Sequence, residues 1–327
     1  MSDNRIQQVT GLSCLPTLFR LSLDNNLLQS FPSVEGSLST LEMLSLRGNQ
    51  LPSFDAACLH GLRSLNLDDN VLEDVYGLEH LPSLDLLSAR AQHGADSGHS
   101  LASSILSQKM HARQVYLSKN SVKTVELSRH HHGIGVLDLS SCGLSDLPIE
   151  FGLHFPNLHK LNLNFNALKD VRPLLNIRGM AELHVAANRI SSFRKSAIAL
   201  GRLASLSVLD MRDNTLTLGF YPPTVAKSAN LQLTVSKNDE SVDLRATPET
   251  CSLRKWRSNL IAKADLDADK EYLKILDGET KLARTVNKVL IADVCTKLKE
   301  LDGLPLVRER SAEEERIWHR LRKIGVL

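Results

Sequence analysis

The three adjacent histidines His130, His131 and His132 are the side chains of this sequence that most suggest chemistry, because imidazole nitrogen is a common metal ligand. Three neighbouring side chains cannot all converge on one ion, and no cysteine or carboxylate is spaced to complete a metal site. His184 has no evident serine or cysteine partner for nucleophilic catalysis. Paired carboxylates, at 68–69 and 267–269, and the glycines match no catalytic or phosphate-binding motif. The sequence therefore predicts no enzyme, no bound metal and no cofactor.

A repeated phrase, L-x-x-L-x-L-x-x-N, organises most of the chain instead. Its clearest copies include LFRLSLDNN from Leu18 and LSVLDMRDN from Leu206. The closing asparagine recurs, with two substitutes in degenerate copies, at Asn26, Asn49, Asn70, Gln92, Asn120, Cys142, Asn166, Asn188 and Asn214. These nine positions are 23.5 residues apart on average. A phrase of this form and period is typical of leucine-rich repeats, which stack into a solenoid.

The leucines at the fourth and sixth places of the phrase, such as Leu65 and Leu67, alternate with polar residues, as in a β-strand with one buried face. We expect one strand per copy, with the strands parallel on the concave side of a curved stack. The asparagine can bond the backbone of neighbouring coils. Repeats of this length leave room for only a short helix or 3₁₀ turn on the convex side. The predicted fold class is α/β, a leucine-rich-repeat horseshoe with a helical C-terminal cap.

The predicted solenoid covers residues 1–238, and the helical cap at 239–327 is expected to pack on the last repeats. From Asn4 onward the sequence matches only the second half of a repeat, and no polar cap precedes it. Because an open stack would leave an unpaired sheet edge, we expect the chain to be a fragment of a longer protein. A short cap without a strand is the alternative.

Two stretches interrupt the repeats. Residues 92–112 are rich in Gly, Ser and His, and they predict a surface loop with a turn of helix around Ile105. The LGFYPP stretch from Leu218, with its proline pair, predicts an extended segment before a last irregular strand at 233–235.

Helical spacing takes over after Asp239. Apolar residues fall at helical intervals at Leu253, Trp256, Leu260 and Ile261, and more strongly at Leu282, Val286, Val289, Leu290 and Val294. Ser311 and Glu314 have the spacing of a capping box, which predicts the start of a last helix.

Composition excludes several classes of function. The 327 residues carry a formal net charge of +2 with both signs well mixed, so neither nucleic acid nor a membrane is expected as a partner. No apolar run approaches the ~18 residues of a membrane span, and the N-terminus has no apolar signal core. Five scattered cysteines without CxxC spacing indicate reduced thiols in the cytoplasm or nucleus.

The concave surface is the remaining candidate for function, because we expect the third, fifth and seventh places of each strand to project from it. Most of these residues are small and polar, but a few apolar and aromatic ones fall on neighbouring coils beside basic residues. Such anchors ringed by charge are typical of protein-binding hot spots, although scattered apolar residues are also common on ordinary surfaces. The candidate partner-binding residues are Arg47, Leu86, Arg90, Tyr116, Val136, Lys160, Phe165, His184 and Arg212.

Residues 269–306, which end in LKELDGLPL, are similar to the closing region of the fungal spindle-pole-body scaffolds that organise the mitotic-exit or septation-initiation network. These scaffolds are relatives of animal centriolin. The repeats from Leu137, Leu161 and Val208 resemble the same family, so the likeness covers most of the chain from residue 18 to residue 327. The repeat phrase is unspecific, whereas the GFYPP insertion and the LKELDGLPL segment are much more telling.

This resemblance implies a non-enzymatic scaffold domain near the C-terminus of a larger, otherwise largely disordered protein. The family holds a small GTPase, its two-part GTPase-activating complex and downstream kinases at the spindle pole body, the microtubule-organising centre associated with the nuclear envelope. Its repeat domain is implicated in anchoring to core pole-body proteins, often coiled coils. The resemblance transfers no binding residue position by position, so the concave candidates depend on surface chemistry alone.

Three other classes of leucine-rich protein stay open. A regulatory subunit of a protein phosphatase has repeats of about this length, but the irregular intervals and the insertion at 92–112 weigh against it. A spliceosomal adaptor carries a similar L-D-G cap, but it has fewer repeats and a basic tail. A GTPase activator uses longer repeats with full convex helices, which the short intervals here do not fit.

Overall fold

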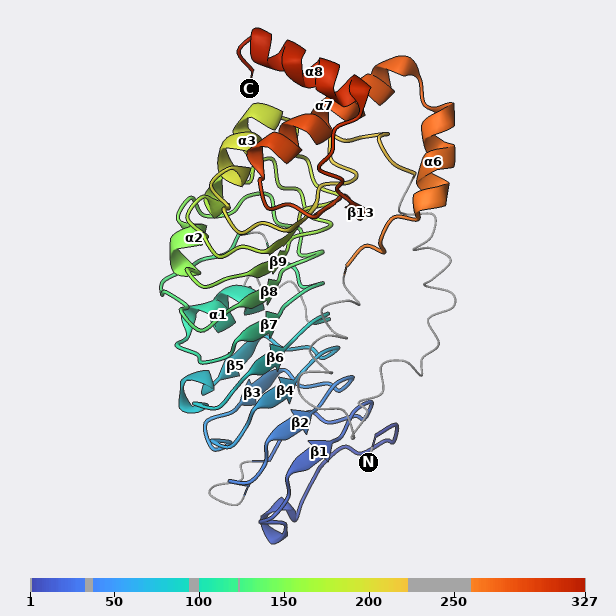
Figure 1. Cartoon of the computed structure of the whole chain (residues 1–327). Helices are drawn as coiled ribbons and strands as arrows, with labels where there is room; N and C mark the ends of the chain where they lie inside the picture. Colours follow the sequence, from blue (N-terminus) through green and yellow to red (C-terminus); the bar gives the residue numbers. More distant parts are fainter. Residues whose placement is uncertain (1, 33–37, 94–99, 123, 223–259, 327) are drawn as a thin grey trace.

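The computed structural model describes residues 2–32, 38–93, 100–122, 124–222 and 260–326, and these form a curved stack of coils (Figure 1). One sheet of 11 strands runs the length of the stack, and a separate two-stranded sheet lies beside it. The predicted α/β leucine-rich-repeat solenoid is therefore confirmed.

Nine short strands of the long sheet come from the nine copies of the repeat phrase. They are β1 (Arg20–Ser22), β2 (Met43–Ser45), β4 (Ser64–Asn66), β6 (Leu86–Ser88), β7 (Gln114–Tyr116), β8 (Val136–Asp138), β9 (Lys160–Asn162), β10 (Glu182–His184) and β11 (Val208–Asp210). Successive strands pair in parallel and in register, so the third place of one copy lies opposite the third place of the next. The leucines of the phrase fill one continuous core inside the coils.

The asparagine ladder joins each coil to the one before it. The Nδ2 of Asn49 donates to Leu23 O at 3.0 Å and to Leu46 O at 2.9 Å, and its Oδ1 accepts from Leu28 N at 3.1 Å. The residue before the asparagine has a left-handed backbone in copy after copy, including Phe165 at φ 57°. This turn brings the asparagine inward, where its amide satisfies backbone groups that the strands leave unpaired.

Among the described residues, the convex side carries only short elements, as the repeat length predicts. They are η1 (Leu12–Cys14), η2 (Leu78–His80), α1 (Leu101–Ser107), α2 (Phe151–His154), η3 (Arg172–Leu174) and α3 (Phe193–Leu200). The helix expected around Ile105 is α1, whose apolar side is buried. The two-stranded sheet of β3 (Ser53–Asp55) and β5 (Asp74–Tyr76) was not predicted; only its central residues, Phe54 and Val75, are buried.

The N-terminal residues continue the repeat register, as predicted from Asn4. Asp3 N donates to Asp24 O at 2.9 Å, and Ile6 N donates to the Oδ1 of Asn26 at 3.1 Å, which repeats the geometry of the later coils. Leu12 joins the core. Among residues 2–19 there is no strand ahead of β1. The expectation that the chain belongs to a longer protein stays a prediction.

The C-terminal region contains helices α6 (Leu266–Ile275), α7 (Gly278–Val294) and α8 (Ala312–Lys323), with β12 (Glu300–Leu301) and β13 (Leu304–Pro305) between α7 and α8. Helix α7 lies against α3, α8 lies on α7, and Ser311 and Glu314 form the predicted capping box (Figure 1). The expectation of a purely helical cap is incomplete, because β12 pairs in parallel with β11 and extends the concave sheet, and β13 turns back antiparallel.

Other expectations in this region had different outcomes. Leu260 and Ile261 are not helical, and Leu253, Trp256 and the strand at 233–235 lie outside the described residues. The segment expected to be extended from Leu218 instead forms a turn, in which Phe220 N donates to Thr217 O at 3.1 Å, before Pro223 and the residues beyond it leave the described part. No helix in the described ranges has the length and apolar character that crossing a bilayer requires.

Candidate functional site

The seventh places of the strands do not project freely from the concave face, because many of them bond the backbone of the next coil. The Oδ1 of Asp68 accepts from Ser88 Oγ at 2.5 Å and from Arg90 N at 2.9 Å. Asp24 makes the same pair of contacts two coils earlier, with Ser45 and Arg47. These carboxylates are buried and are part of the framework.

Where the previous coil provides no acceptor for the N–H at the seventh place, the side chain at the fifth place of the same strand provides one. Asn66, Asp138, Asn162 and Asp210 each accept from the N–H two residues further along their own chain, at 3.3, 3.0, 3.1 and 3.2 Å. A buried N–H without a partner is costly, so a polar side chain is needed at one of these two places. The expectation that the fifth and seventh places project from the concave face is therefore incomplete, because several of their polar side chains bond backbone N–H groups.

The basic residues among the candidates form ion pairs within the concave face. Arg90 pairs with Asp68 at 2.9 Å and Arg212 with Asp210 at 2.6 Å, and all four side chains are largely buried. Two pairs are more accessible: Arg47 with Asp69 at 2.8 Å, and Lys160 with Glu182 at 2.7 Å. Lys160 is therefore better placed than Arg90 or Arg212 to meet a partner.

Leu86, Tyr116 and Val136 come together on the adjacent strands β6, β7 and β8, as expected, but they are 1%, 1% and 7% exposed. The expectation that they form an open patch is wrong. Leu260, which reaches this face from far along the chain, packs against them. We call these three residues the concave apolar cluster. Phe165 does not belong to it and is 40% exposed.

Residues 260–265, which we call the strap, lead from the concave apolar cluster to the start of α6 (Figure 1). The Nη1 of Arg212 donates to Ala262 O at 3.1 Å, and Lys263 Nζ lies 2.5 Å from Glu300. A side chain at Gly303 would place its Cβ 2.8 Å from the backbone N of Ala264, so only glycine allows this approach. Sequence reasoning missed the strap, since its contacts follow no periodic pattern.

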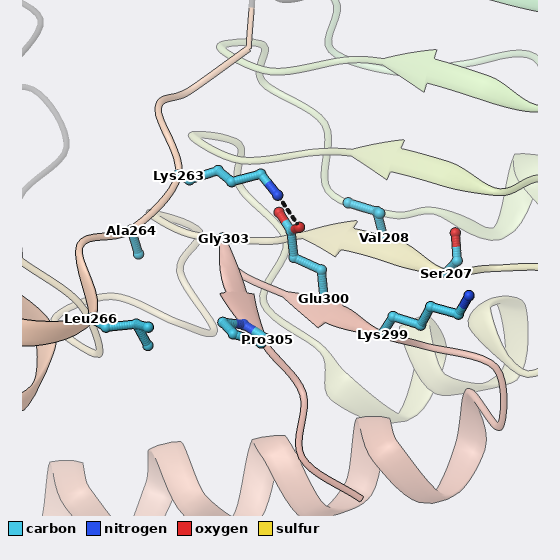
Figure 2. Close-up of a pocket in the computed structure, with 9 residues that line it drawn as sticks. All are labelled: Ser207, Val208, Lys263, Ala264, Leu266, Lys299, Glu300, Gly303 and Pro305. Atoms are coloured by element: carbon cyan, nitrogen blue, oxygen red, sulfur yellow. Dashed lines mark hydrogen bonds and ion pairs between the residues drawn. The ribbon is translucent and has the colours of Figure 1, made fainter.

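A hollow of about 440 Å³ lies between the strap, the last strands and the start of α6. Figure 2 shows Lys263 turned toward Glu300 across it, with Val208 on the β11 side and Pro305 on the β13 side. Its lining contains no histidine and no cysteine, so it offers no nucleophile–base pair of the kinds considered above. The lining combines aliphatic carbon with the amines of Lys263 and Lys299 and the carboxylate of Glu300.

The histidines considered for chemistry are occupied by structural contacts. His131 Nε2 lies 2.7 Å from Leu106 O and its ring stacks on Phe155, and burial lowers the pKa of His131. His130 stacks on His154 at 5.0 Å. His184 is buried on the concave side of β10, where burial lowers its pKa. Within the described ranges no three His, Cys, Asp or Glu side chains are placed to hold a metal ion.

The GFYPP and LKELDGLPL segments, distant in sequence, meet in the structure. Tyr221 OH donates to the Oδ2 of Asp302 at 2.7 Å, and Met211 N donates to its Oδ1 at 2.7 Å. Arg284 of α7 lies over the Tyr221 ring at 4.2 Å and pairs with Asp269 at 2.7 Å. Burial and the nearby Asp210 carboxylate raise the pKa of Asp302 to about 7. This network fastens the C-terminal region to the last repeat.

Comparison with known proteins supports the fold. No family model matches the chain. Septation initiation network scaffold protein cdc11 of Schizosaccharomyces pombe is 29% identical over 161 residues, which is 49% of this chain and 15% of that protein. Podocan-like protein 1 of Homo sapiens is 28% identical over 263 residues, 71% of this chain and 46% of that protein. The chain thus spans less than half the length of each.

Two solved structures resemble the stack. The APL1 leucine-rich repeat domain has a TM-score of 0.51 and 23% identity, covering 64% of this chain and 54% of that one. The leucine-rich repeat domain of APL1B has a TM-score of 0.50 and 21% identity, covering 64% and 60%. The chain has the leucine-rich-repeat fold.

Proposed function

We propose that this chain is a non-enzymatic protein-interaction domain of a scaffold, and that it docks a polypeptide segment on its concave face. The observation that carries this proposal is the concave apolar cluster with Leu260 packed on it, because it is a place on the open side of the stack where an apolar side chain of an irregular segment is held. A buried apolar centre with an accessible charged pair nearby, Lys160 with Glu182, is the arrangement of a protein-binding surface.

The setting we propose is the spindle pole body. The likeness to a septation initiation network scaffold supports this setting, as does the direct contact between the GFYPP and LKELDGLPL segments, which gives both motifs a shared structural role. The partners we propose are core pole-body proteins, often coiled coils, and the GTPase and two-part GTPase-activating complex of the mitotic-exit or septation network. We propose neither nucleic acid nor membrane as a partner.

Binding of the purified chain to individual pole-body coiled-coil proteins and to the GTPase-activating complex tests this function. We expect Lys160→Glu, in the concave strand β9, and Phe165→Asp, in the turn that follows β9, to weaken binding at least about tenfold, since each removes or reverses an accessible contact. Ile149→Asp is the control, because Ile149 is 70% exposed and lies next to α2 on the convex side. Calorimetric titration gives the affinities.

Loss of binding with Ile149→Asp alone would place the interface on the convex side and contradict the concave proposal. Binding to none of these proteins, together with co-purification of a phosphatase catalytic subunit, would contradict the scaffold setting. Arg90→Glu is not a suitable probe, since it places a negative charge beside the buried Asp68 and so perturbs folding.

A further inference from the structure

We propose that the strap, residues 260–265, is an internal ligand of the concave face, and that an external partner binds there by displacing it. The partner segment we infer is extended and carries a leucine followed three residues later by a basic residue, as Leu260 and Lys263 do. This inference rests on the proposed function of the concave face and adds to it how the face is regulated.

Three kinds of contact hold the strap, and each is a common mode of peptide recognition. Leu260 packs into the concave apolar cluster, the Ala262 carbonyl accepts from Arg212, and the Lys263 amine pairs with Glu300. An apolar anchor, a main-chain hydrogen bond and a charged pair together specify a sequence without requiring a helix or a strand. The same three groups are therefore available to any segment that reproduces this chemistry.

The receptor side is rigid independently of the strap. Arg212 is held by two hydrogen bonds to the Asp210 carboxylate, at 2.9 and 2.6 Å, and these fix the plane of the guanidinium whose Nη1 donates to the strap carbonyl. Glu300 belongs to β12, which is paired with β11. Leu86, Tyr116 and Val136 belong to three paired strands. A pre-formed site of this kind loses little freedom when one segment replaces another.

The strap itself is held less firmly than the elements after it. The Lys263 side chain is 78% exposed, and Ala262 and Lys263 are both exposed residues. At Asp265 the strap ends in a helix cap, where the carboxylate accepts from Asp267 N at 3.0 Å and Ala268 N at 3.3 Å, so α6 tethers it. The tethered strap competes with a free partner for the concave face at an effective concentration of roughly millimolar. A free partner must therefore bind more tightly than the strap or bind multivalently.

Leu260→Asp tests this inference, because a carboxylate cannot remain in the apolar cluster without a large desolvation cost. Leu282→Asp is the matched control: it is the same change at a leucine that is 51% exposed, lies in α7 and does not line the hollow. The probe is the blocked peptide Leu-Ile-Ala-Lys-Ala-Asp, the sequence of residues 260–265. Nuclear magnetic resonance titration of each variant measures its affinity and follows the Tyr116 ring signals.

We expect the peptide to bind the Leu260→Asp chain at least about tenfold more tightly than the unaltered chain or the Leu282→Asp chain, and to shift the Tyr116 signals. The same peptide with aspartate in place of its leucine should bind none of them. Equal binding to all three chains, or no binding to a folded Leu260→Asp chain, overturns the inference.

Hydrogen exchange provides a second readout that needs no ligand. Leu260→Asp should leave exchange in β11 and β12 unchanged, because these strands pair with each other and not with the strap. Faster exchange throughout α6, α7 and β12 would make Leu260 a structural core residue and would also overturn the inference. A proposed partner that binds the unaltered and Leu260→Asp chains equally would contradict displacement of the strap but not the docking function. A partner that binds neither chain would contradict the docking function, and the peptide titration would still test whether the strap occupies the concave face.

Discussion

Individual side chains on the concave face mostly serve the backbone of the stack. The repeat needs an acceptor for the N–H at the seventh place of each strand, and Asp24, Asp68, Asn164 or a fifth-place residue provides it. A polar residue at these places is thus explained without a ligand.

Replacing Asp68 by Asn tests this structural role. We expect a loss of about 2–4 kcal/mol in the free energy of unfolding, because the change leaves the largely buried Arg90 without its counter-charge. Asp69→Asn is the matched control, with an expected loss below about 1 kcal/mol, since Asp69 is 37% exposed and pairs with Arg47 at the surface. Denaturant unfolding measures both, and similar losses for the two variants would contradict the assignment.

At the residue scale, the buried leucines and the asparagine ladder could be predicted because they repeat with a short period. The burial of Leu86, Tyr116 and Val136 could not, because the residue that packs on them, Leu260, belongs to no repeat. Local spacing carries no information about such a distant contact.

At the scale of elements, the junction between the last repeat and the C-terminal region depends on Asp302. Its neighbours are Tyr221, Met211 and the Asp210–Arg212 pair, and it is fully buried. Because its pKa is raised to about 7 in the folded chain from 3.8, folding takes up a proton between these values. The contribution of Asp302 to stability is therefore full below about pH 4, falls as the pH rises, and levels off above about pH 7.

Asp302→Asn removes this titration. We expect the difference in unfolding free energy between the unaltered and Asp302→Asn chains to change by a few kcal/mol between pH 4 and pH 7. The unaltered chain becomes less stable relative to the Asp302→Asn chain as the pH rises. Asp267→Asn, at a carboxylate that is 90% exposed, is the control for the substitution itself, with an expected loss below about 1 kcal/mol in the free energy of unfolding. A difference that stays flat across this range would show that Asp302 is ionised throughout.

The helices and strands could be predicted from the sequence only where their residues follow a period. Helix α7 has a long apolar stripe and α8 begins with a capping box, and both were expected. The strands β12, β13, β3 and β5 have two or three residues each, and unlike the equally short repeat strands they lie outside the repeated phrase that marks a strand in the sequence. They form because neighbouring strands supply partners.

At the scale of the whole molecule, each coil depends mainly on its neighbours, as expected for a solenoid. Helix α8 is at the end of this series and has no buried residues; it contacts α7 through Lys288 with Glu314 at 2.6 Å and Trp318 with Asp293 at 3.0 Å.

Deletion of residues 312–327 should therefore lower Tm by less than about 4 °C and keep unfolding cooperative. Leu290→Ala is the comparison, since Leu290 is 6% exposed in α7 and its truncation should cost about 2–5 kcal/mol. Calorimetry measures both, and a deletion that unfolds the chain would show that α8 is integral to the stack.

The reversal of the chain at β13 also determines how the molecule ends its sheet. A parallel array would otherwise present a row of vacant donors and acceptors on which a second molecule could assemble, as fibres do. Here the outermost strand is two residues long, and one of them, Pro305, has no N–H to offer. One proline and one tight turn thus disfavour the addition of another strand at this end of the described sheet.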